Sequence, residues 1–174
     1  MAFIVEQDVE NAALEMLHEM GYEIVYAPEI APDGSNPQRV SWDTVFLLDK
    51  LEAALKKLNP DVPDDAIQEA IKKITKTTSH KIIVNNEQFH ELVINGVEVE
   101  HREKGRIKNS HLKIFDREKP ERNTFQALNQ FTIIENKHNR RPDILIFING
   151  LPVGLIELKN PASATATVRS AYDQ

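Results

Sequence analysis

Three charged side chains stand at the outer ends of two apolar stretches late in the chain. Asp143 opens the first stretch, and Glu157 and Lys159 close the second. Successive residues of a strand face opposite sides, so Glu157 and Lys159 would share a face and Leu158 would lie on the other. Two carboxylates offer hard oxygen ligands to Mg²⁺, and an ammonium group neutralises charge that develops on a phosphate. The set therefore predicts a divalent-metal site that acts on phosphate.

The dipeptide Asn149-Gly150 between the two stretches predicts a β-hairpin, and its register decides whether the carboxylates meet. A strict two-residue turn would leave Asp143 and Glu157 on opposite faces. One extra residue in the connection would pair them, about 5 Å apart at Cβ. We therefore predict a three-residue or bulged connection with Gly150 in the left-handed conformation. Pro152 supports this, because it has no N–H to donate to the hydrogen-bond ladder of a tighter hairpin.

The residues around this hairpin resemble a known family. Pro142-Asp143 followed by Glu157-Leu158-Lys159 resembles the PD-(D/E)XK nuclease motif. The wider pattern resembles the N-terminal nuclease domain of the R (restriction) subunit of type I restriction-modification enzymes, and its parts are Asn129-Gln-Phe-Thr132, Arg140-Arg-Pro-Asp-Ile144, Phe147, Asn149-Gly-Leu-Pro152 and Ile156-Glu-Leu-Lys-Asn-Pro161. A bare D…ExK pattern often occurs by chance, whereas this extended block is much more specific.

The resemblance is strongest over residues 110–174 and softer over 1–30. It implies an α/β (α+β) fold with a PD-(D/E)XK restriction-endonuclease-like core, in which helices flank a central mixed β-sheet. It implies one nuclease domain over residues 1–174, with a helical-hairpin insert at about 43–78. It also implies a fragment of a longer chain whose ATP-dependent translocase domains are absent, and the sequence has no GxxxxGK[ST] phosphate loop.

The same resemblance implies roles for the charged residues. Asp143, Glu157 and the Leu158 carbonyl would hold Mg²⁺, and Lys159 would orient water or stabilise the transition state of phosphodiester hydrolysis. Gln174 matches the start of a QxxxY pattern that the family carries on the helix after the site. The implied substrate is double-stranded DNA, the implied partners are a methyltransferase and a specificity subunit, and ATP would be used only by the full-length enzyme.

An amphipathic helix is predicted for residues 5–20, ending at Gly21. Its apolar stripe comprises Val9, Ala13, Met16, Leu17 and Met20. Glu6 falls inside this stripe and Glu10 at its edge, and a carboxylate on a buried face needs a reason. Both could simply favour the helix dipole. The resemblance supports a second interpretation, in which one of them, with Glu10 slightly preferred, reaches the metal site.

Periodicity and turn residues predict the remaining elements. A second helix would be capped by Ser41 or Asp43 and stopped at Asn59-Pro60, and a third would start at Pro63. Short extended segments are predicted at residues 22–26, 97–100 and 131–135, and helical character at 164–174. Residues 81–84 are either a short strand or the lead into a helix, with one helical turn near 86–92. Arg39 is interpreted as a solvated loop charge rather than a phosphate contact. The charged residues 101–119 form either a solvated strand and loop or a phosphate-contacting edge.

Composition limits the classes of protein that fit. The 174 residues suffice for one domain with a real core, and no apolar run or leader predicts membrane association or secretion. The absence of Cys excludes disulfides and Cys-bound zinc, in agreement with a cytoplasmic protein. The net charge of −6 argues against tight DNA binding by this piece alone. Two alternatives stay open: another PD-(D/E)XK enzyme, such as a repair nuclease or junction resolvase, or a module that docks DNA or subunits without cutting.

Overall fold

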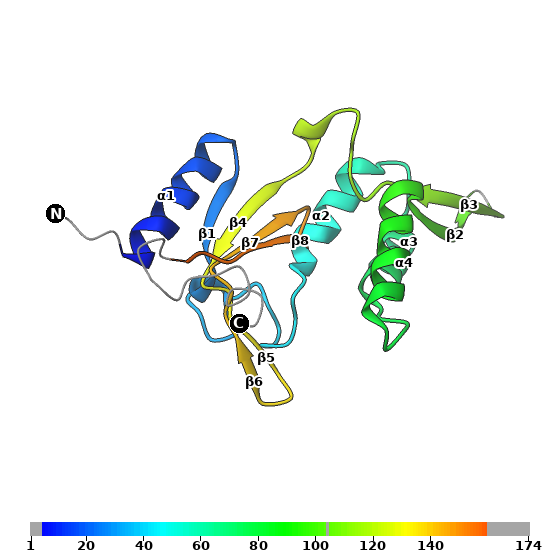
Figure 1. Cartoon of the computed structure of the whole chain (residues 1–174). Coiled ribbons are helices and arrows are strands. Elements are labelled where there is room, and N and C mark those ends of the chain that lie inside the picture. Colours follow the sequence, from blue (N-terminus) through cyan, green and yellow to red (C-terminus); the bar gives the residue numbers. More distant parts are fainter. Residues whose placement is uncertain (1–4, 104, 160–174) are drawn as a thin grey trace. The chain divides into compact units, whose positions relative to one another are not determined.

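A computed structural model describes residues 5–103 and 105–159, which divide into two compact units (Figure 1). The first unit contains the described parts of Met1–Val45, Phe125–Ile148 and Pro152–Gln174, and the second contains those of Phe46–Thr124 and Asn149–Leu151. The chain is mixed α/β with a mixed sheet, so the predicted fold class is confirmed. The prediction of one nuclease domain over the whole chain stays a prediction.

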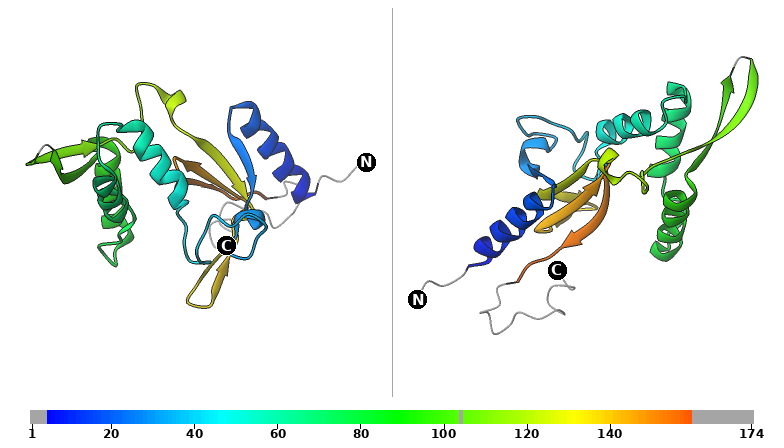
Figure 2. Two further views of the ribbon diagram at one scale, coloured as in Figure 1. Left: turned by 180° about the vertical axis from the view of Figure 1, so that it is seen from behind. Right: turned by 90° about the horizontal axis from the view of Figure 1, so that it is seen from above.

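The first unit is built on a four-stranded sheet with the order β1-β4-β7-β8. Its strands are β1 (Glu23–Tyr26), β4 (Phe125–Asn129), β7 (Ile144–Ile148) and β8 (Leu151–Ile156). Strand β4 runs parallel to β1 and antiparallel to β7, which makes the sheet mixed. A separate antiparallel pair joins β5 (Ile133–Glu135) to β6 (His138–Arg140). Helix α1 (Glu6–Glu19) lies beside β1 in both Figures 1 and 2.

Strand β4 lies between β1 and β7, and sequence patterning did not predict it. Its middle residues Gln126, Ala127 and Leu128 are all buried, so both faces are covered and no polar alternation marks it as a strand. The strand predicted at residues 131–135 is confirmed only for β5. The chain bends between β4 and β5 at Gln130, whose φ is 58°.

Helix α1 confirms the predicted helix, but its buried face differs from the predicted stripe. Glu10 is its one buried residue, whereas Met16 and Met20 are 66% and 72% exposed. The assumption that all five apolar residues of the stripe share the buried face is therefore wrong. The helix is rotated so that a carboxylate lies against the sheet.

Arg39 is buried rather than solvated, so its interpretation as a loop charge is wrong. Its guanidinium donates hydrogen bonds to the carbonyls of Thr44 (2.8 Å), Trp42 (2.9 Å) and Thr132 (2.9 Å) and lies 3.9 Å from the centre of the Phe131 ring. Burial lowers the pKa of Arg39 from its ordinary value. The side chain thus holds the loop before the second unit in place.

The second unit contains three helices and an antiparallel strand pair. They are α2 (Leu48–Leu58), α3 (Asp64–Thr75), α4 (Ile82–Asn95), β2 (Val97–Glu103) and β3 (Arg106–Leu112), followed by a short 3₁₀ helix at Pro120–Arg122. The predicted helical hairpin is confirmed by α2 and α3, which pack together, and α3 also packs on β2. The core is apolar and includes Leu51, Leu55, Ile67, Val97, Leu112 and Leu151.

The predicted start of the second helix is wrong. Helix α2 starts after Leu47, not at Ser41 or Asp43, because Ser41 and Asp43 hydrogen-bond each other in a turn. Helix α4 is one helix of 14 residues, so of the two alternatives for residues 81–84 the lead into a helix is confirmed and the short strand is wrong. It ends at Gly96, whose φ of 79° suits the residue after a helix. Among the described residues, no helix has the length and apolar content required to cross a bilayer.

Candidate active site

The turn of the β7–β8 hairpin contains two residues, so of the two predicted connections the three-residue loop is wrong and the bulged one is left. Asn149 and Gly150 both have positive φ, 52° and 80°, as the centre of a type I′ turn requires. Strand β8 nevertheless has six residues where β7 has five. A Cβ built on Gly154 would lie 3.6 Å from the Cβ of Ile146, so these positions face the same side. The extra residue is therefore accommodated within β8.

This register directs Asp143 toward the segment that follows β8. Because Gly154 faces the same side as Ile146, strand alternation places Asp143 and Glu157, which directly precede β7 and follow β8, on one common side. Asp143 Oδ2 accepts a hydrogen bond of 2.7 Å from the backbone N–H of Leu158. The carboxylate is half-buried and lies beside the Glu-Leu-Lys segment, as the hairpin argument requires.

Glu157 and Lys159 lie close enough for an electrostatic interaction. Lys159 Nζ is 3.6 Å from Glu157 Oε1 and 4.0 Å from Glu6 Oε1. The side chains of Glu157 and Lys159 are only 13% and 24% exposed, whereas Glu6 is 55% exposed. Glu157 and Lys159 thus share one partly shielded environment, which the first turn of α1 borders.

Glu10 is the carboxylate of α1 that the fold buries, with 5% of its surface exposed. Asn129 Nδ2 donates to its Oε1 at 3.0 Å, and Gln130 Nε2 donates to Oε1 at 3.2 Å and Oε2 at 3.1 Å. The backbone N–H of Gln130 in turn donates to the carbonyl of Asp143 at 3.3 Å. Helix α1, the end of β4 and the start of β7 are therefore connected through Gln130.

Sequence reasoning missed the functions of Asn129 and Gln130 as partners of Glu10. The two adjacent amides at the end of a buried strand were the available signal, since an amide N–H is a suitable donor to a buried carboxylate. Gln174, the remaining predicted site residue, lies outside the described residues.

The donors at this end of the hairpin suit a hard divalent cation. Carboxylate oxygens of Asp143 and Glu157 and the Leu158 carbonyl are the ligand types that Mg²⁺ takes in proteins. Within residues 5–103 and 105–159, however, no three His, Asp or Glu side chains lie near enough together to bind a metal ion. The described arrangement is a carboxylate pair with an adjacent ammonium group, and the chemistry of its donors fits Mg²⁺.

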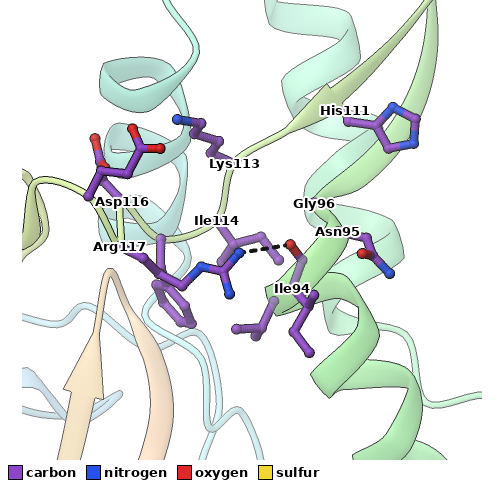
Figure 3. Close-up of a pocket in the computed structure, with 11 residues that line it drawn as sticks. Ile94, Asn95, Gly96, His111, Lys113, Ile114, Asp116 and Arg117 are labelled. Carbon is purple, nitrogen blue, oxygen red and sulfur yellow. Dashed lines mark hydrogen bonds between the residues drawn. The ribbon is translucent and has the colours of Figure 1, made fainter.

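The other predicted polar region lies in the second unit, at β2, β3 and the loop that follows. Arg102 and Arg106 are exposed, and His101 is buried with Nε2 2.9 Å from Ser110 Oγ. A cavity of about 290 Å³ lies between the end of α4 and the loop after β3 (Figure 3). Arg117 crosses it to donate to the Ile94 carbonyl at 3.2 Å. None of the predicted catalytic residues lines this cavity.

The chain is similar to known proteins over nearly its whole length. Residues 3–174 match the family described as type I restriction enzyme R protein N terminus. The chain is 34% identical, over 97% of its length, to the type I restriction enzyme HindI endonuclease subunit of Haemophilus influenzae. It is 32% identical, over 95% of its length, to a putative type I restriction enzyme MjaIXP endonuclease subunit of Methanocaldococcus jannaschii. The matched region spans 16% of the length of each relative.

Proposed function

Because the chain belongs to the family of type I restriction enzyme R protein N termini, we propose that it is the metal-dependent endonuclease domain of such an R subunit. It would hydrolyse DNA phosphodiester bonds after ATP-driven translocation by the rest of the polypeptide. The observation that carries the proposal is the convergence of Asp143, Glu157 and Lys159 at the open end of one hairpin. A hydrolytic site on phosphate needs this combination of acidic ligands and a cation.

In the proposed reaction, Asp143, Glu157 and the Leu158 carbonyl would hold Mg²⁺. When bound, the ion supplies Lewis-acid polarisation of the phosphate and lowers the pKa of a coordinated water. Lys159 orients the attacking water and stabilises the negative charge that builds up on the phosphoryl oxygens. The Leu158 N–H fixes the Asp143 carboxylate by donating to Oδ2, so the geometry of the ligand depends on the backbone of the motif itself.

Glu10 is the better candidate of the two helix carboxylates. It is buried and accepts hydrogen bonds from the side-chain amides of Asn129 and Gln130. The backbone N–H of Gln130 also donates a hydrogen bond to the carbonyl of Asp143. We assign Glu10 to a second metal or to a metal-bound water, and Gln174 to positioning of the DNA backbone or the nucleophile. Glu6 is exposed and contacts Lys159, so we assign it no ligand role.

The proposed substrate is double-stranded DNA, and the proposed partners are the methyltransferase and specificity subunits of a restriction complex. The relatives are named as endonuclease subunits, which supports an assembly of several chains. ATP would be used only by the remainder of the R subunit. A cytoplasmic location follows from this assignment and remains part of the proposal.

A module that docks without cutting is the second candidate. Two observations favour it: the described residues contain no group of three potential metal ligands, and the chain carries a net charge of −6. In that case the contact of Lys159 with Glu157 would be a structural ion pair at a strand end. The two proposals differ in whether DNA cleavage depends on Lys159.

The test is cleavage of supercoiled plasmid by the complete enzyme, assembled with full-length R subunit in Mg²⁺ or Mn²⁺ and ATP. Lys159→Ala should abolish nicking and linearisation while ATP hydrolysis persists. Lys72→Ala, at an exposed position of α3, is the matched control and should cleave normally. Cleavage that survives Lys159→Ala would place the cutting site elsewhere and favour the docking module.

A further inference from the structure

Helix α1 carries an apolar row that the sheet does not cover. Val9, Ala12, Met16 and Met20 follow one another at spacings of three or four residues, which places them within an arc of about 80° on the helix. We call these four residues the outer ridge. Met16 is 66% exposed, Met20 is 72% exposed, Ala12 is exposed and Val9 is half-buried. Within the first unit, β1 is the strand that lies beside α1 in Figures 1 and 2.

The outer ridge is not part of the buried face of the helix. The helix is oriented by Glu10, which lies against the end of β4, and this orientation turns both methionines toward solvent. Single exposed apolar residues are common, but a continuous row of them on one helix is characteristic of a surface that packs against another helix. Methionine also suits such a surface because its unbranched side chain adapts to the partner.

An acidic row borders the outer ridge and limits what can cover it. Asp8, Glu15 and Glu19 project beside the ridge, on the flank away from the sheet, and all three are exposed. A second copy of α1 would bring the two acidic rows together, and nucleic acid would bring phosphates to them. A helix with Lys or Arg next to its apolar stripe has the complementary charge.

Such a helix can belong to the rest of the polypeptide, because the relatives are much longer than the matched region. The family is described as an N terminus, and the match covers 16% of each relative, so more than four-fifths of each relative lies outside it. The segment after β8 lies near the first turn of α1, because Lys159 Nζ is 4.0 Å from Glu6 Oε1. Residues 160–174 contain one Arg and one Asp and so lack a basic face.

From these observations we infer that the outer ridge of α1 is the docking surface for a basic amphipathic helix in the later part of the same R polypeptide. The apolar ridge provides the area of contact, and the acidic row selects the charge and orientation of the partner. Because Glu10 lies on the same helix, this contact would also fix the helix that delivers a carboxylate to the proposed site. The inference rests on membership of the family and not on cleavage.

The test is site-specific photo-crosslinking in the full-length R polypeptide. p-Benzoylphenylalanine at the position of Met16 or Met20 should give an intramolecular cross-link to one Lys/Arg-rich helical segment beyond residue 174. The same probe at the exposed position of His18, on another side of the helix, is the control and should give no such link. The double variant Glu15→Lys/Glu19→Lys should lower the yield about tenfold, which corresponds to about 1.4 kcal/mol.

Oxidation by hydrogen peroxide provides an independent readout in the unlabelled protein. Met16 and Met20 should oxidise several-fold more slowly in full-length wild type than in the Glu15→Lys/Glu19→Lys variant. Cross-links to a second copy, to another subunit or to DNA would overturn the inference, as would equally fast oxidation in both proteins. Lys159→Ala should leave the cross-link unchanged while removing cleavage, so failure of the docking inference is distinguishable from failure of the proposed function.

Discussion

The two ends of the β7–β8 hairpin differ in how firmly they are held. At the turn, Asn149 is 1% exposed, and its side chain accepts from the Thr124 N–H (2.8 Å) and donates to the Ile114 carbonyl (2.8 Å) and Asn123 Oδ1 (3.0 Å). The Gly150 carbonyl accepts a hydrogen bond of 3.0 Å from the Leu47 N–H, and the surrounding backbone leaves no room for a side chain at position 150. This end is fixed by hydrogen bonds and close backbone contacts.

The open end carries charged groups that are less buried than Asn149. The Asp143 carboxylate accepts a hydrogen bond from the Leu158 N–H, and the side chains of Glu157 and Lys159, 13% and 24% exposed, lie 3.6 Å apart. Side chains that bind a metal or a phosphate must be able to exchange their partners when the ligand arrives. One short element thus combines a buried turn, which sets the register, with a less buried end where that register brings the charged groups together.

The largest expected effect is a loss of DNA cleavage when the open end of the hairpin is changed. Glu157→Gln should lower plasmid cleavage by the complete enzyme by on the order of 10³, because it removes one proposed metal ligand. It should change the free energy of unfolding by less than about 1 kcal/mol, since a partly exposed ion pair contributes little. Parallel cleavage assays and urea unfolding measure both quantities. A large loss of stability with cleavage retained would reverse the roles of the two ends.

The next effect concerns the turn itself. Gly150→Ala should reduce the free energy of unfolding by about 3 kcal/mol. Its Cβ would lie 2.5 Å from the Leu47 carbonyl oxygen and 2.8 Å from the Leu51 nitrogen, at a φ of 80°. Gly105→Ala is the matched control, because Gly105 has the same φ with nothing within 4 Å, and should cost about 1 kcal/mol. Urea-induced unfolding, monitored by the helical circular dichroism signal, measures both free energies. Equal losses in the two variants would show that the close backbone contact at Gly150 does not affect stability.

A smaller loss is expected at the neighbouring position. Asn149→Ala should cost about 2 kcal/mol, because buried donors and acceptors at Thr124 and Ile114 lose their partner. Asn139→Ala, at an exposed position of β6, is the control and should change stability by less than about 0.5 kcal/mol. Thermal and urea unfolding of both variants provide the measurement. Indistinguishable midpoints would mean that water replaces the Asn149 side chain at no cost.

The smallest effect depends on pH and concerns Asp116, which Asn123 links to the turn. The Lys119 N–H lowers the pKa of the Asp116 carboxyl below its ordinary value of 3.8. A lowered folded-state pKa gives stability that is full above 3.8 and is lost as pH falls through the folded-state pKa. Asp116→Asn removes this component, so unfolding midpoints of the variant should fall less between about pH 5 and 3 than those of wild type. Parallel pH profiles would contradict the prediction.

Local patterns predicted the elements whose stabilising contacts are near in sequence. Helix periodicity predicted α1, α2 and α3, and Asn149-Gly150 predicted the hairpin. Strand β4 was missed because contacts with β1 and β7 define it, and α4 was predicted only as one of two alternatives because Asn85 and Asn86 interrupt its apolar pattern. Arg39 was misinterpreted because one of its carbonyl partners, Thr132, lies 93 residues away. Long-range contacts of this kind leave no periodic signal.

The proximity of the motif residues could be predicted from the sequence, and their surroundings could not. Strand alternation and the hairpin are local properties, so Asp143 could be expected near the Glu157–Lys159 segment; that these residues form a nuclease site stays a prediction. Sequence favoured Glu10 over Glu6 only slightly, since the amides that surround Glu10 come from residues 119 and 120 positions away. The three-residue loop was wrong because the extra residue lies within β8, where nothing in the sequence marks the position of a bulge.

The most direct test of the account is a titration of the full-length R polypeptide with Mn²⁺ in the absence of ATP, followed by calorimetry. Wild type should bind the ion, and Asp143→Asn, which keeps the shape of the side chain and removes its charge, should weaken this binding at least tenfold. Asp61→Asn, at an exposed position between α2 and α3, is the control and should bind as wild type does. Unchanged affinity and stoichiometry in Asp143→Asn would contradict the assignment of the hairpin as a metal-dependent nuclease site.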